Sequence, residues 1–362
     1  MAIPHLLSSC KDGVVFLTSV RMDPVTKKIA RKLQHRGVPI EYTRKSVIDP
    51  TVFSDGELCP EIRHNVREKV VFLFWDFMPD NFTGHLNVRI KELELVLDAL
   101  KRYGAKHVNL IVPYLPYSRQ DRRMKKRQPG SAKKLAKSLE RFGIIRYLVT
   151  FDLHAPQITE FYDNIIVENI PAHVIFARHF RKMFAEEIKK EELRINSTDV
   201  GGSKRARDFA EEIHPGLDIA IVDKRRDESG SKAIKIIGDV SRVMISYDDI
   251  GGTMGSMLDS CAMVMEAGSK KTFGAFTHNV CSPKEVAGDK KGKLTSAEAK
   301  IANAKIPMFT LDTLPRGKQY YKDNPLITRI PYHGFLAQAV LQLMSVNGSV
   351  SRLVDTWSTL EK

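Results

Sequence analysis

A pattern of helix, glycine, strand and polar turn, repeated along the 362 residues, constrains the fold more than any other feature of this sequence. In the first copy, apolar residues keep helical spacing from Leu86 to Leu100. Gly104 then suits a helix C-cap, and residues 107–112 form a short apolar strand that runs into polar residues. The other copies pair a helix at 135–142 with a strand at 147–150, and a helix at 258–267 with a strand at 272–276.

This alternation predicts α/β domains, each with a mostly parallel sheet flanked by helices on both faces. Short apolar runs predict further strands at 14–18, 70–75, 219–222 and 243–246, and apolar spacing predicts a last helix at 335–344. Such sheets bind ligands outside the carboxyl ends of their strands, so the polar residues after each strand are the candidate site residues. The length favours two domains; we place them at 1–168 and 169–362.

The composition, with 43% apolar residues and a formal net charge of +14, is that of an ordinary globular protein. No apolar run approaches the roughly 20 residues that span a bilayer, and the first ten residues lack the order of a secretory signal. We therefore expect a cytoplasmic protein with no membrane segment. The four cysteines are too scattered for a metal site or a redox pair.

The positive charge suits nucleic acid, an anionic membrane surface or phosphorylated small molecules. Aromatic residues do not interleave with the basic ones as a base-stacking surface requires, so we expect only weak, non-specific association with nucleic acid. The polar and Lys-rich stretch at 282–300 is predicted to be a solvated loop or insertion.

The segment YDDIGGTMGS, residues 247–256, is the most informative one. It follows an apolar strand and precedes a helix, so backbone N–H groups can hold a phosphate there. Asp248 and Asp249 can accept hydrogen bonds from sugar hydroxyls, which together predicts a ribose-phosphate site. A tight turn with two solvated carboxylates explains this segment equally well when it is taken alone.

Two further strand ends carry residues that suit a divalent cation. Asp152 and His154 lie in FDLHAPQ, where an imidazole beside a carboxylate can bind a cation or its water shell. Asp199 lies in NSTDVGG, where it can share that cation and the glycines let phosphates approach the backbone. Taken singly, a hydrogen-bonded histidine and a common Asp-x-Gly-Gly turn are the simpler explanations.

Three more segments carry groups suited to a nucleotide. In IVDKRR, a predicted strand is followed by three cationic residues. Of these, Lys224 and Arg226 can stabilise the negative charge that spreads over phosphate oxygens during phosphoryl transfer. In PYLPYSRQDRR, Arg119 offers a planar fork for phosphate and Gln120 can read a base edge. In the acidic turn FSDGE, the candidates are an aromatic ring that can stack on a purine and two carboxylates, namely Phe53, Asp55 and Glu57. In isolation, solvated surface loops explain the basic run and the acidic turn.

In this order and spacing the segments resemble the ribose-phosphate pyrophosphokinase (phosphoribosyl pyrophosphate synthetase) family. That family has an FSDGE-type loop, a PYxPYxRQDR loop, a DLHAxQ strand end, an acid-x-Gly-Gly segment, a K-x-R loop and a DDxxDTGGT loop. The resemblance runs from about Val14 to Val354. It implies two tandem phosphoribosyltransferase-type (Rossmann-like) domains, an N-terminal pyrophosphokinase domain and a C-terminal domain with the ribose-phosphate loop.

The resemblance also implies a reaction. The anomeric hydroxyl of ribose 5-phosphate would attack the β-phosphorus of Mg-ATP, giving phosphoribosyl pyrophosphate and AMP. The implied contacts are Phe53, Asp55 and Glu57 of a neighbouring subunit with adenine, Arg119 and Gln120 with ATP, His154 and Asp199 with Mg²⁺, Lys224 and Arg226 with the transferring group, and Asp248, Asp249, Gly252, Thr253, Met254, Gly255 and Ser256 with ribose 5-phosphate. A shared adenine site implies a homo-oligomer, from dimer to hexamer.

The sequence departs from the family pattern in three places. Gly252 stands where the family has its third aspartate, and Met254, Gly255 and Ser256 replace the GGT that follows. The THGxFSGPA segment becomes residues 277–282, before the Lys-rich stretch, so family regulation does not carry over. Phenylalanine, tryptophan and aspartate replace the usual Gln-Ser at 74–76.

The departures leave alternatives open. The acceptor could be another 5-substituted ribose such as ADP-ribose, or the chain could be a catalytically weak homologue that regulates an active synthetase. Retention of the cationic and metal-binding residues argues against a purely regulatory role. A phosphoribosyltransferase would share the DD-containing loop but would not need the segments assigned to ATP.

Overall fold

The computed structural model describes residues 5–11, 13–78, 86–227, 230–282, 284–285 and 294–357, with backbone alone at 224–227, 230–234, 284–285 and 294. The chain forms two compact units, Met1–Ile170 with Tyr332–Asp355, and Pro171–Pro331 with Thr356–Lys362. We call them the N-terminal and C-terminal units. The predicted division at 168/169 assigned the whole chain end to the second domain, whereas Tyr332–Asp355 belongs to the N-terminal unit because helix α11 (His333–Met344) packs on α2 (Asp23–Gln34).

The N-terminal unit is built on a parallel sheet with the strand order β2-β1-β6-β7-β8-β9, in which β3 also pairs with β1. Its strands are β1 (Val14–Ser19), β2 (Ile40–Glu41), β3 (Val47–Ile48), β6 (Val70–Phe74), β7 (His107–Ile111), β8 (Ile145–Phe151) and β9 (Ile166–Ile170). A separate hairpin joins β4 (Thr51–Val52) to β5 (Leu58–Cys59). The other helices are α1 (Ser8–Lys11), α3 (Leu86–Arg102), α4 (Ser131–Glu140) and α12 (Val350–Trp357), with 3-10 turns η1 (Arg44–Ser46), η2 (Ser118–Gln120) and η3 (Pro156–Phe161).

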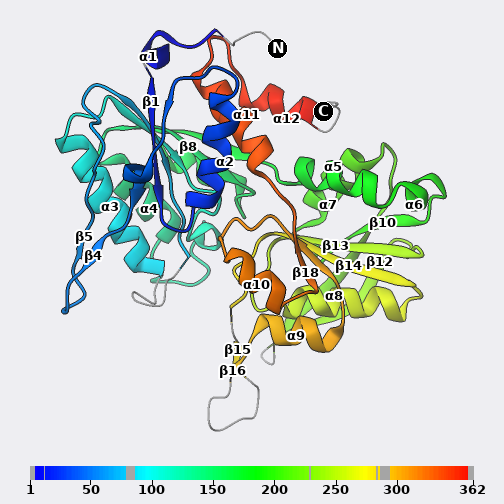
Figure 1. The fold of residues 1–362 in the computed structure, drawn as a ribbon. Coiled ribbons are helices and arrows are strands. Elements are labelled where there is room, and N and C mark those ends of the chain that lie inside the picture. Colours follow the sequence, from blue (N-terminus) through cyan, green and yellow to red (C-terminus); the bar gives the residue numbers. More distant parts are fainter. Residues whose placement is uncertain are drawn as a thin grey trace. The chain divides into compact units, whose positions relative to one another are not determined.

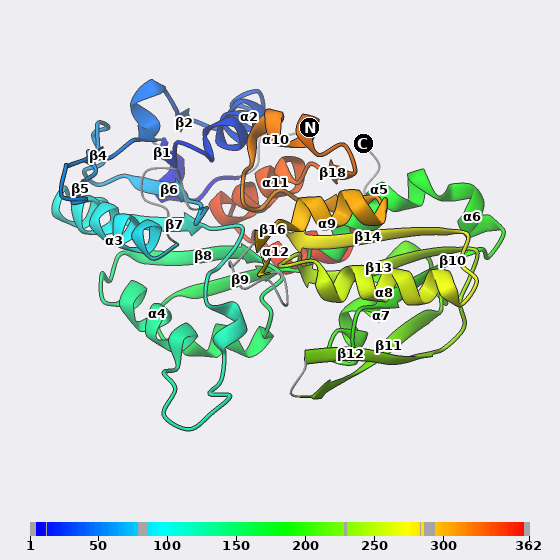
Figure 2. The ribbon, with the colours of Figure 1, turned by 90° about the horizontal axis from the view of Figure 1, so that it is seen from below.

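Alternation along the strands covers both faces of this sheet. Val15, Leu17, Val71 and Leu73 face one core, which α3 and α4 complete (Figure 2). Phe16, Phe72 and Phe74 lie on the other face, where the rings of Phe16 and Phe74 are 5.1 Å apart. Helix α11 covers that second face beside α2 (Figure 1), and its Phe335 contacts Phe151 of β8 at 6.4 Å between ring centroids. The predicted layered sheet is confirmed.

The C-terminal unit has the strand order β12-β11-β10-β13-β14-β17-β18. All neighbours are parallel except β11 and β12, the long antiparallel pair at one edge (Figure 2). Its strands are β10 (Leu193–Ser197), β11 (Ile219–Asp227), β12 (Gly230–Ile237), β13 (Val243–Ile250), β14 (Lys271–His278), β17 (Met308–Thr310) and β18 (Ile327–Arg329), with a short pair β15 (Lys284–Glu285) and β16 (Leu294–Thr295). Its helices are α5 (His173–Met183), α6 (Ala185–Lys189), α7 (Ser203–Ile213), α8 (Gly255–Glu266), α9 (Ala297–Ala304) and α10 (Gly317–Asp323).

Aromatic side chains pack one face of the C-terminal sheet and sulfur-containing side chains the other. Phe176 of α5 and Phe209 of α7 lie against Tyr247 of β13, with ring centroids 5.7 and 4.4 Å away. Met257 and Cys261 of α8 pack in a separate core together with α9. Both faces are therefore buried, as expected of a parallel sheet.

The predicted elements are confirmed with two differences. β13 extends to Ile250 and β11 to Asp227, because the pairing with β14 and β12 continues through polar residues that read as loop. The predicted loop at 282–300 ends early, since α9 begins at Ala297 after an N-cap in which Ser296 accepts from Ala299 N. Residues 283 and 286–293 of that stretch lie outside the described residues.

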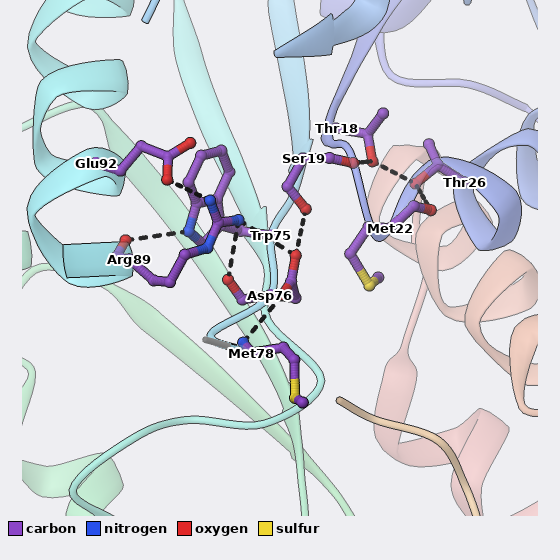
Figure 3. Close-up of polar contacts among 9 residues, drawn as sticks. All are labelled: Thr18, Ser19, Met22, Thr26, Trp75, Asp76, Met78, Arg89 and Glu92. Carbon is purple, nitrogen blue, oxygen red and sulfur yellow. Dashed lines mark hydrogen bonds and ion pairs between the residues drawn. The ribbon is translucent and has the colours of Figure 1, made fainter. Parts of the chain in front are cut away.

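A buried ion cluster closes the carboxyl end of β6 (Figure 3). Asp76 accepts from the hydroxyl of Ser19 at 2.6 Å and pairs with Arg89 of α3 at 3.3 Å. Arg89 also pairs with Glu92 and lies 4.8 Å from the ring centroid of Trp75. All three charged side chains are at most 7% exposed, so each depends on the others for charge compensation.

Candidate functional site

Two of the predicted segments meet at the carboxyl edge of the N-terminal sheet because β7 and β8 are neighbours there. Gln157 of the FDLHAPQ segment donates from Nε2 to Asp121 of the PYLPYSRQDRR segment at 2.8 Å. Tyr117 has φ of 62°, a strained conformation for an aromatic residue, and its hydroxyl donates to Asn87 of α3 at 2.5 Å. The loop that carries Arg119 and Gln120 is thus held on both sides.

The predicted ligand side chains of this edge are accessible. Arg119 and Gln120 are exposed on the 3-10 turn η2, and His154 is exposed just after β8. Asp152 instead is buried, with φ of 32°, and its N–H donates to Ile170 O at 3.0 Å. Arg119, Gln120 and His154 can therefore contact a ligand, whereas Asp152 shapes the turn.

The FSDGE turn lies at the tip of the β4–β5 hairpin. The N–H groups of Phe53 and Gly56 donate to Glu57 O and Phe53 O, both at 2.9 Å, and Asp55 accepts from Glu57 N at 3.1 Å. The Phe53 ring is 51% exposed, and Asp55 and Glu57 are exposed too. The hairpin thus presents an aromatic ring and carboxylates to solvent.

In the C-terminal unit, the paired carboxylates lie at the carboxyl end of β13. Asp248 accepts from the Thr198 hydroxyl at 2.7 Å, which joins it to the end of β10. Arg205 of α7 reaches both carboxylates, at 3.2 Å from Asp249 and 3.7 Å from Asp248. Thr198 and Arg205 were missed as site residues by the sequence analysis; the signal was the position of Arg205 in the first turn of the helix after Gly201 and Gly202.

One guanidinium does not offset two adjacent carboxylates. Burial, and then the charge of Asp249, raise the pKa of Asp248 from 3.8 to about 7. The Asp248 carboxyl of the free site is therefore partly protonated near neutral pH. A ligand that donates hydrogen bonds or carries positive charge is expected to displace that proton.

This pKa gives a pH-dependent stability. The folded protein binds a proton at Asp248 that the unfolded chain loses above about 3.8, so the carboxyl stabilises the fold most at low pH and loses that contribution as pH rises to about 7. Between pH 5 and 8, the thermal unfolding midpoint of the wild type is expected to fall more steeply than that of Asp248→Asn, which lacks the titrating carboxyl. Parallel midpoint curves for the two proteins would contradict the assignment.

Asp199 lies in a turn that its own side chain fixes. Its Oδ1 accepts from Gly202 N at 2.8 Å, and its carbonyl accepts from the Ser197 hydroxyl at 2.7 Å. A Cβ added to Gly202 would come within 3.0 Å of Ser197 Oγ, so this glycine lets the turn close. Asp199 is half-buried beside Thr198, and so lies near the Asp248 segment.

The predicted phosphate loop runs from β13 into α8. Its buried Gly251 is tightly packed, since an added Cβ would come within 2.5 Å of the Phe276 ring. Met254 is the N-cap residue of α8, with φ of 64° and no side-chain cap, so Gly255 and Ser256 begin the helix. Lys300 of α9 donates to Thr253 O at 3.0 Å. Thr253 to Ser256 thus lead into the first turn of α8, and the Met254 side chain does not cap the N–H groups of that turn.

Lys224 and Arg226 have backbone positions in β11, opposite Ala233 and Ser231 of β12. Their side chains lie outside the described part of the structure. The residues predicted as a basic loop therefore have their backbone in an antiparallel strand pair, β11 with β12.

In the C-terminal unit the structure brings together the segments that carry Asp199 and the Asp248–Ser256 loop. In the N-terminal unit it joins the segment of Arg119 and Gln120 to that of His154. Among the described residues, no group of three or more His, Cys, Asp and Glu side chains is arranged to hold a metal ion. Within the same residues, no helix combines the length and apolarity needed to cross a bilayer.

The fold and the site define a protein of two α/β units, with a carboxylate pair and an open helix start at the carboxyl end of a parallel sheet. The profile for the N-terminal domain of ribose phosphate pyrophosphokinase matches residues 15–143. The ribose-phosphate pyrophosphokinase of Cereibacter sphaeroides is 34% identical, over 92% of this chain and 92% of the relative. That of Helicobacter hepaticus is 35% identical, over 72% of this chain and 83% of the relative.

The crystal structure of phosphoribosylpyrophosphate synthetase from Mycobacterium smegmatis has the same fold. Its TM-score is 0.74 at 24% identity, over 91% of this chain and 98% of that chain. Together with the identities above, these findings show that the chain belongs to the ribose-phosphate pyrophosphokinase family. The predicted family and fold class are confirmed.

Proposed function

We propose that this chain transfers the β,γ-pyrophosphoryl group of Mg-ATP to the C1 hydroxyl of ribose 5-phosphate, which yields phosphoribosyl pyrophosphate and AMP. The observation that carries the proposal is the Asp248–Asp249 pair beside the start of α8. Membership of the family supports the reaction type.

Ribose 5-phosphate combines a phosphate with vicinal hydroxyls, and the loop offers a group for each. In this proposal the first-turn N–H groups of α8, around Gly252, Thr253, Met254, Gly255 and Ser256, receive the phosphate. Asp248 and Asp249 accept from the ring hydroxyls. These hydrogen bonds stabilise the charged form of Asp248, which burial and then the charge of Asp249 disfavour by raising its pKa.

Arg119 and Gln120 bind ATP in this proposal, and His154 and Asp199 hold Mg²⁺. Both proposed ligands have groups that bind Mg²⁺, since Asp199 offers a carboxylate oxygen and His154 an imidazole that binds the ion directly or through water. Asp199 is half-buried and His154 is exposed. Mg²⁺ retains waters and substrate phosphates as ligands, so it does not require a cluster of three protein side chains. When bound, the ion would neutralise charge on the phosphates.

The chain's own cations would complete the chemistry. The oxygen of the C1 hydroxyl bonds to the β-phosphorus as the bond from that phosphorus to the α,β-bridging oxygen breaks, so AMP leaves and the hydroxyl releases its proton. Lys224 and Arg226 are proposed to stabilise the charge on the transferring group.

Phe53, Asp55 and Glu57 are proposed to contact adenine bound by a neighbouring copy, since the exposed hairpin tip suits an intermolecular contact. Such a contact requires a homo-oligomer, for which we propose a size between a dimer and a hexamer.

An assay of the purified chain with ATP, Mg²⁺ and ribose 5-phosphate tests the proposal. Equimolar AMP and phosphoribosyl pyrophosphate are expected by mass spectrometry. ADP in place of AMP, or no product, would refute it.

One observation favours a second candidate acceptor. Gly252 provides neither a carboxylate nor any other side chain at the position where the family pattern has its third aspartate. The absence of a side chain leaves room for a larger 5-substituted ribose such as ADP-ribose. AMP formation with ADP-ribose and not with ribose 5-phosphate in the same assay would select this candidate.

A further inference from the structure

A buried polar network lies behind the proposed ribose-phosphate loop, at the carboxyl ends of β14 and β17. Asn279 and Asp312 are its centre, exposed to 0% and 5%. Asp312 Oδ1 accepts from Asn279 Nδ2 at 3.2 Å, from the Tyr321 hydroxyl at 2.5 Å and from Arg316 N at 3.1 Å. The other carboxylate oxygen is 3.5 Å from Nη1 of Arg329. Asp312 therefore joins the residue after β14, helix α10 and strand β18 through one carboxylate.

Asn279 is bonded at both ends of its amide. Its Nδ2 also donates to Leu314 O at 3.1 Å, and its Oδ1 accepts from Leu314 N at 3.1 Å. Arg316 donates to the carbonyls of Asn279 and Val280, at 3.0 and 2.5 Å. The 279–280 backbone is thus fixed to the turn at 312–316.

The same segment supports the loop through its backbone. Gly251 N donates to His278 O at 2.9 Å, Cys281 N to Gly251 O at 2.8 Å, and Ser282 N to Gly252 O at 3.1 Å. These three bonds set the path of the chain at Gly251 and Gly252. A displacement of residues 278–282 would consequently displace the loop.

The backbone of the network is strained where it meets the loop. Asp312 and Cys281 have φ of 56° and 45°, in the left-handed region that non-glycine residues seldom adopt. Strain of this kind persists when surrounding contacts impose it, and it concentrates at functional sites. Neither Asn279 nor Asp312 belongs to the predicted site residues.

We infer that Asp312 and Asn279 are positioning residues for ribose 5-phosphate, which hold the 278–282 segment and thereby the shape of the acceptor loop at Gly251 and Gly252. The inference rests on the proposed function of that loop. It assigns to them a role in acceptor binding and none in ATP binding.

Asp312→Ala removes the carboxylate that accepts from Asn279, Tyr321 and Arg316, and puts alanine at a left-handed position. Loss of these buried hydrogen bonds is expected to raise KM for ribose 5-phosphate about tenfold or more, while KM for ATP stays within about twofold. Asp312→Asn keeps an acceptor oxygen, and asparagine tolerates this φ, so it is expected to recover most of the affinity. Asn279→Ala, which adds no backbone strain, is expected to raise KM for ribose 5-phosphate as Asp312→Ala does.

Thr272→Val is the matched control. Thr272 is buried at the opposite end of β14, where its hydroxyl donates to Ser269 at 3.2 Å, so the variant loses a buried hydrogen bond away from the loop. It is expected to lower the unfolding midpoint slightly and to leave both KM values unchanged.

The measurement is steady-state AMP formation with each substrate varied, together with the unfolding midpoint of each variant. An unchanged KM for ribose 5-phosphate in Asn279→Ala, or an equal rise in both KM values, would overturn the inference while the wild-type activity stood. Absence of wild-type AMP formation with ribose 5-phosphate would overturn the proposed function, and the inference with it.

Discussion

Replacement of Lys224 by alanine is expected to lower kcat by about 10²–10³-fold while ATP still binds, since such losses follow removal of one group that stabilises transition-state charge. The ground state of bound ATP has less charge on the transferring group, so its affinity depends less on this cation. The backbone of Lys224 lies in β11, opposite Ala233 of β12.

Lys235→Ala is the control for that experiment. Lys235 is exposed on β12 of the same strand pair, opposite Asp223, and has no proposed role. Both variants are compared by single-turnover AMP formation and by equilibrium binding of ATP. A Lys224→Ala enzyme with near-normal turnover, or one that has lost ATP binding and turnover in equal measure, would refute the assigned role.

Replacement of Arg89 by methionine is expected to destabilise the N-terminal unit by about 3–5 kcal/mol, because it leaves Asp76 and Glu92 buried without their common cation. The triple variant Arg89→Met, Asp76→Asn and Glu92→Gln is expected to recover most of the loss, since it removes the charges as well as their partner. Unfolding is followed by the fluorescence of Trp75, in a Trp357→Phe background, under increasing urea.

Arg102→Ala on the same helix is the control. Arg102 pairs with Asp98 at 2.6 Å on the surface, where the side chains are 74% and 46% exposed, and no measurable change in the urea midpoint is expected. If Arg89→Met and Arg102→Ala unfold at the same urea concentration, the ion cluster does not stabilise the unit.

The sequence predicted the strands well where a strand is apolar throughout. The runs that begin at Val14 and Val70 are buried along their whole length, and their shortness and their β-branched and aromatic residues favour a central strand. The end of β13 was not predicted, because Asp248 and Asp249 are polar and only the partner strand β14 shows that pairing continues. The polar residues that let a strand end bind a ligand are therefore also the ones that hide the end of the strand from prediction.

The site was predicted by residue type but not by its supports. The motif residues in YDDIGGTMGS could be named because carboxylates and small residues have recognisable chemistry. Arg205 and Asp312 could not, since an arginine in a helix and an aspartate in a turn acquire their meaning from partners more than 40 and 30 residues away in the chain, Asp249 and Asn279. Long-range pairing of this kind leaves no local pattern.

The last helix illustrates the same limit. Apolar spacing predicted α11, but not that it would complete the sheet of the other unit. An amphipathic helix has the same pattern whichever sheet it covers. Its assignment depends on Phe335, which packs against Phe151, and on the contact with α2.

That assignment has a consequence for biosynthesis. Leu7 N donates to Met344 O and Val346 N to His5 O, both at 2.8 Å, so the first and last described segments of the N-terminal unit are joined to each other. During translation the N-terminal unit emerges first, yet the part of its sheet that α11 covers stays exposed until residues 333–344 have left the ribosome. Residues 171–331 of the C-terminal unit leave the ribosome before α11 does, so the sheet that is made first is completed only after them.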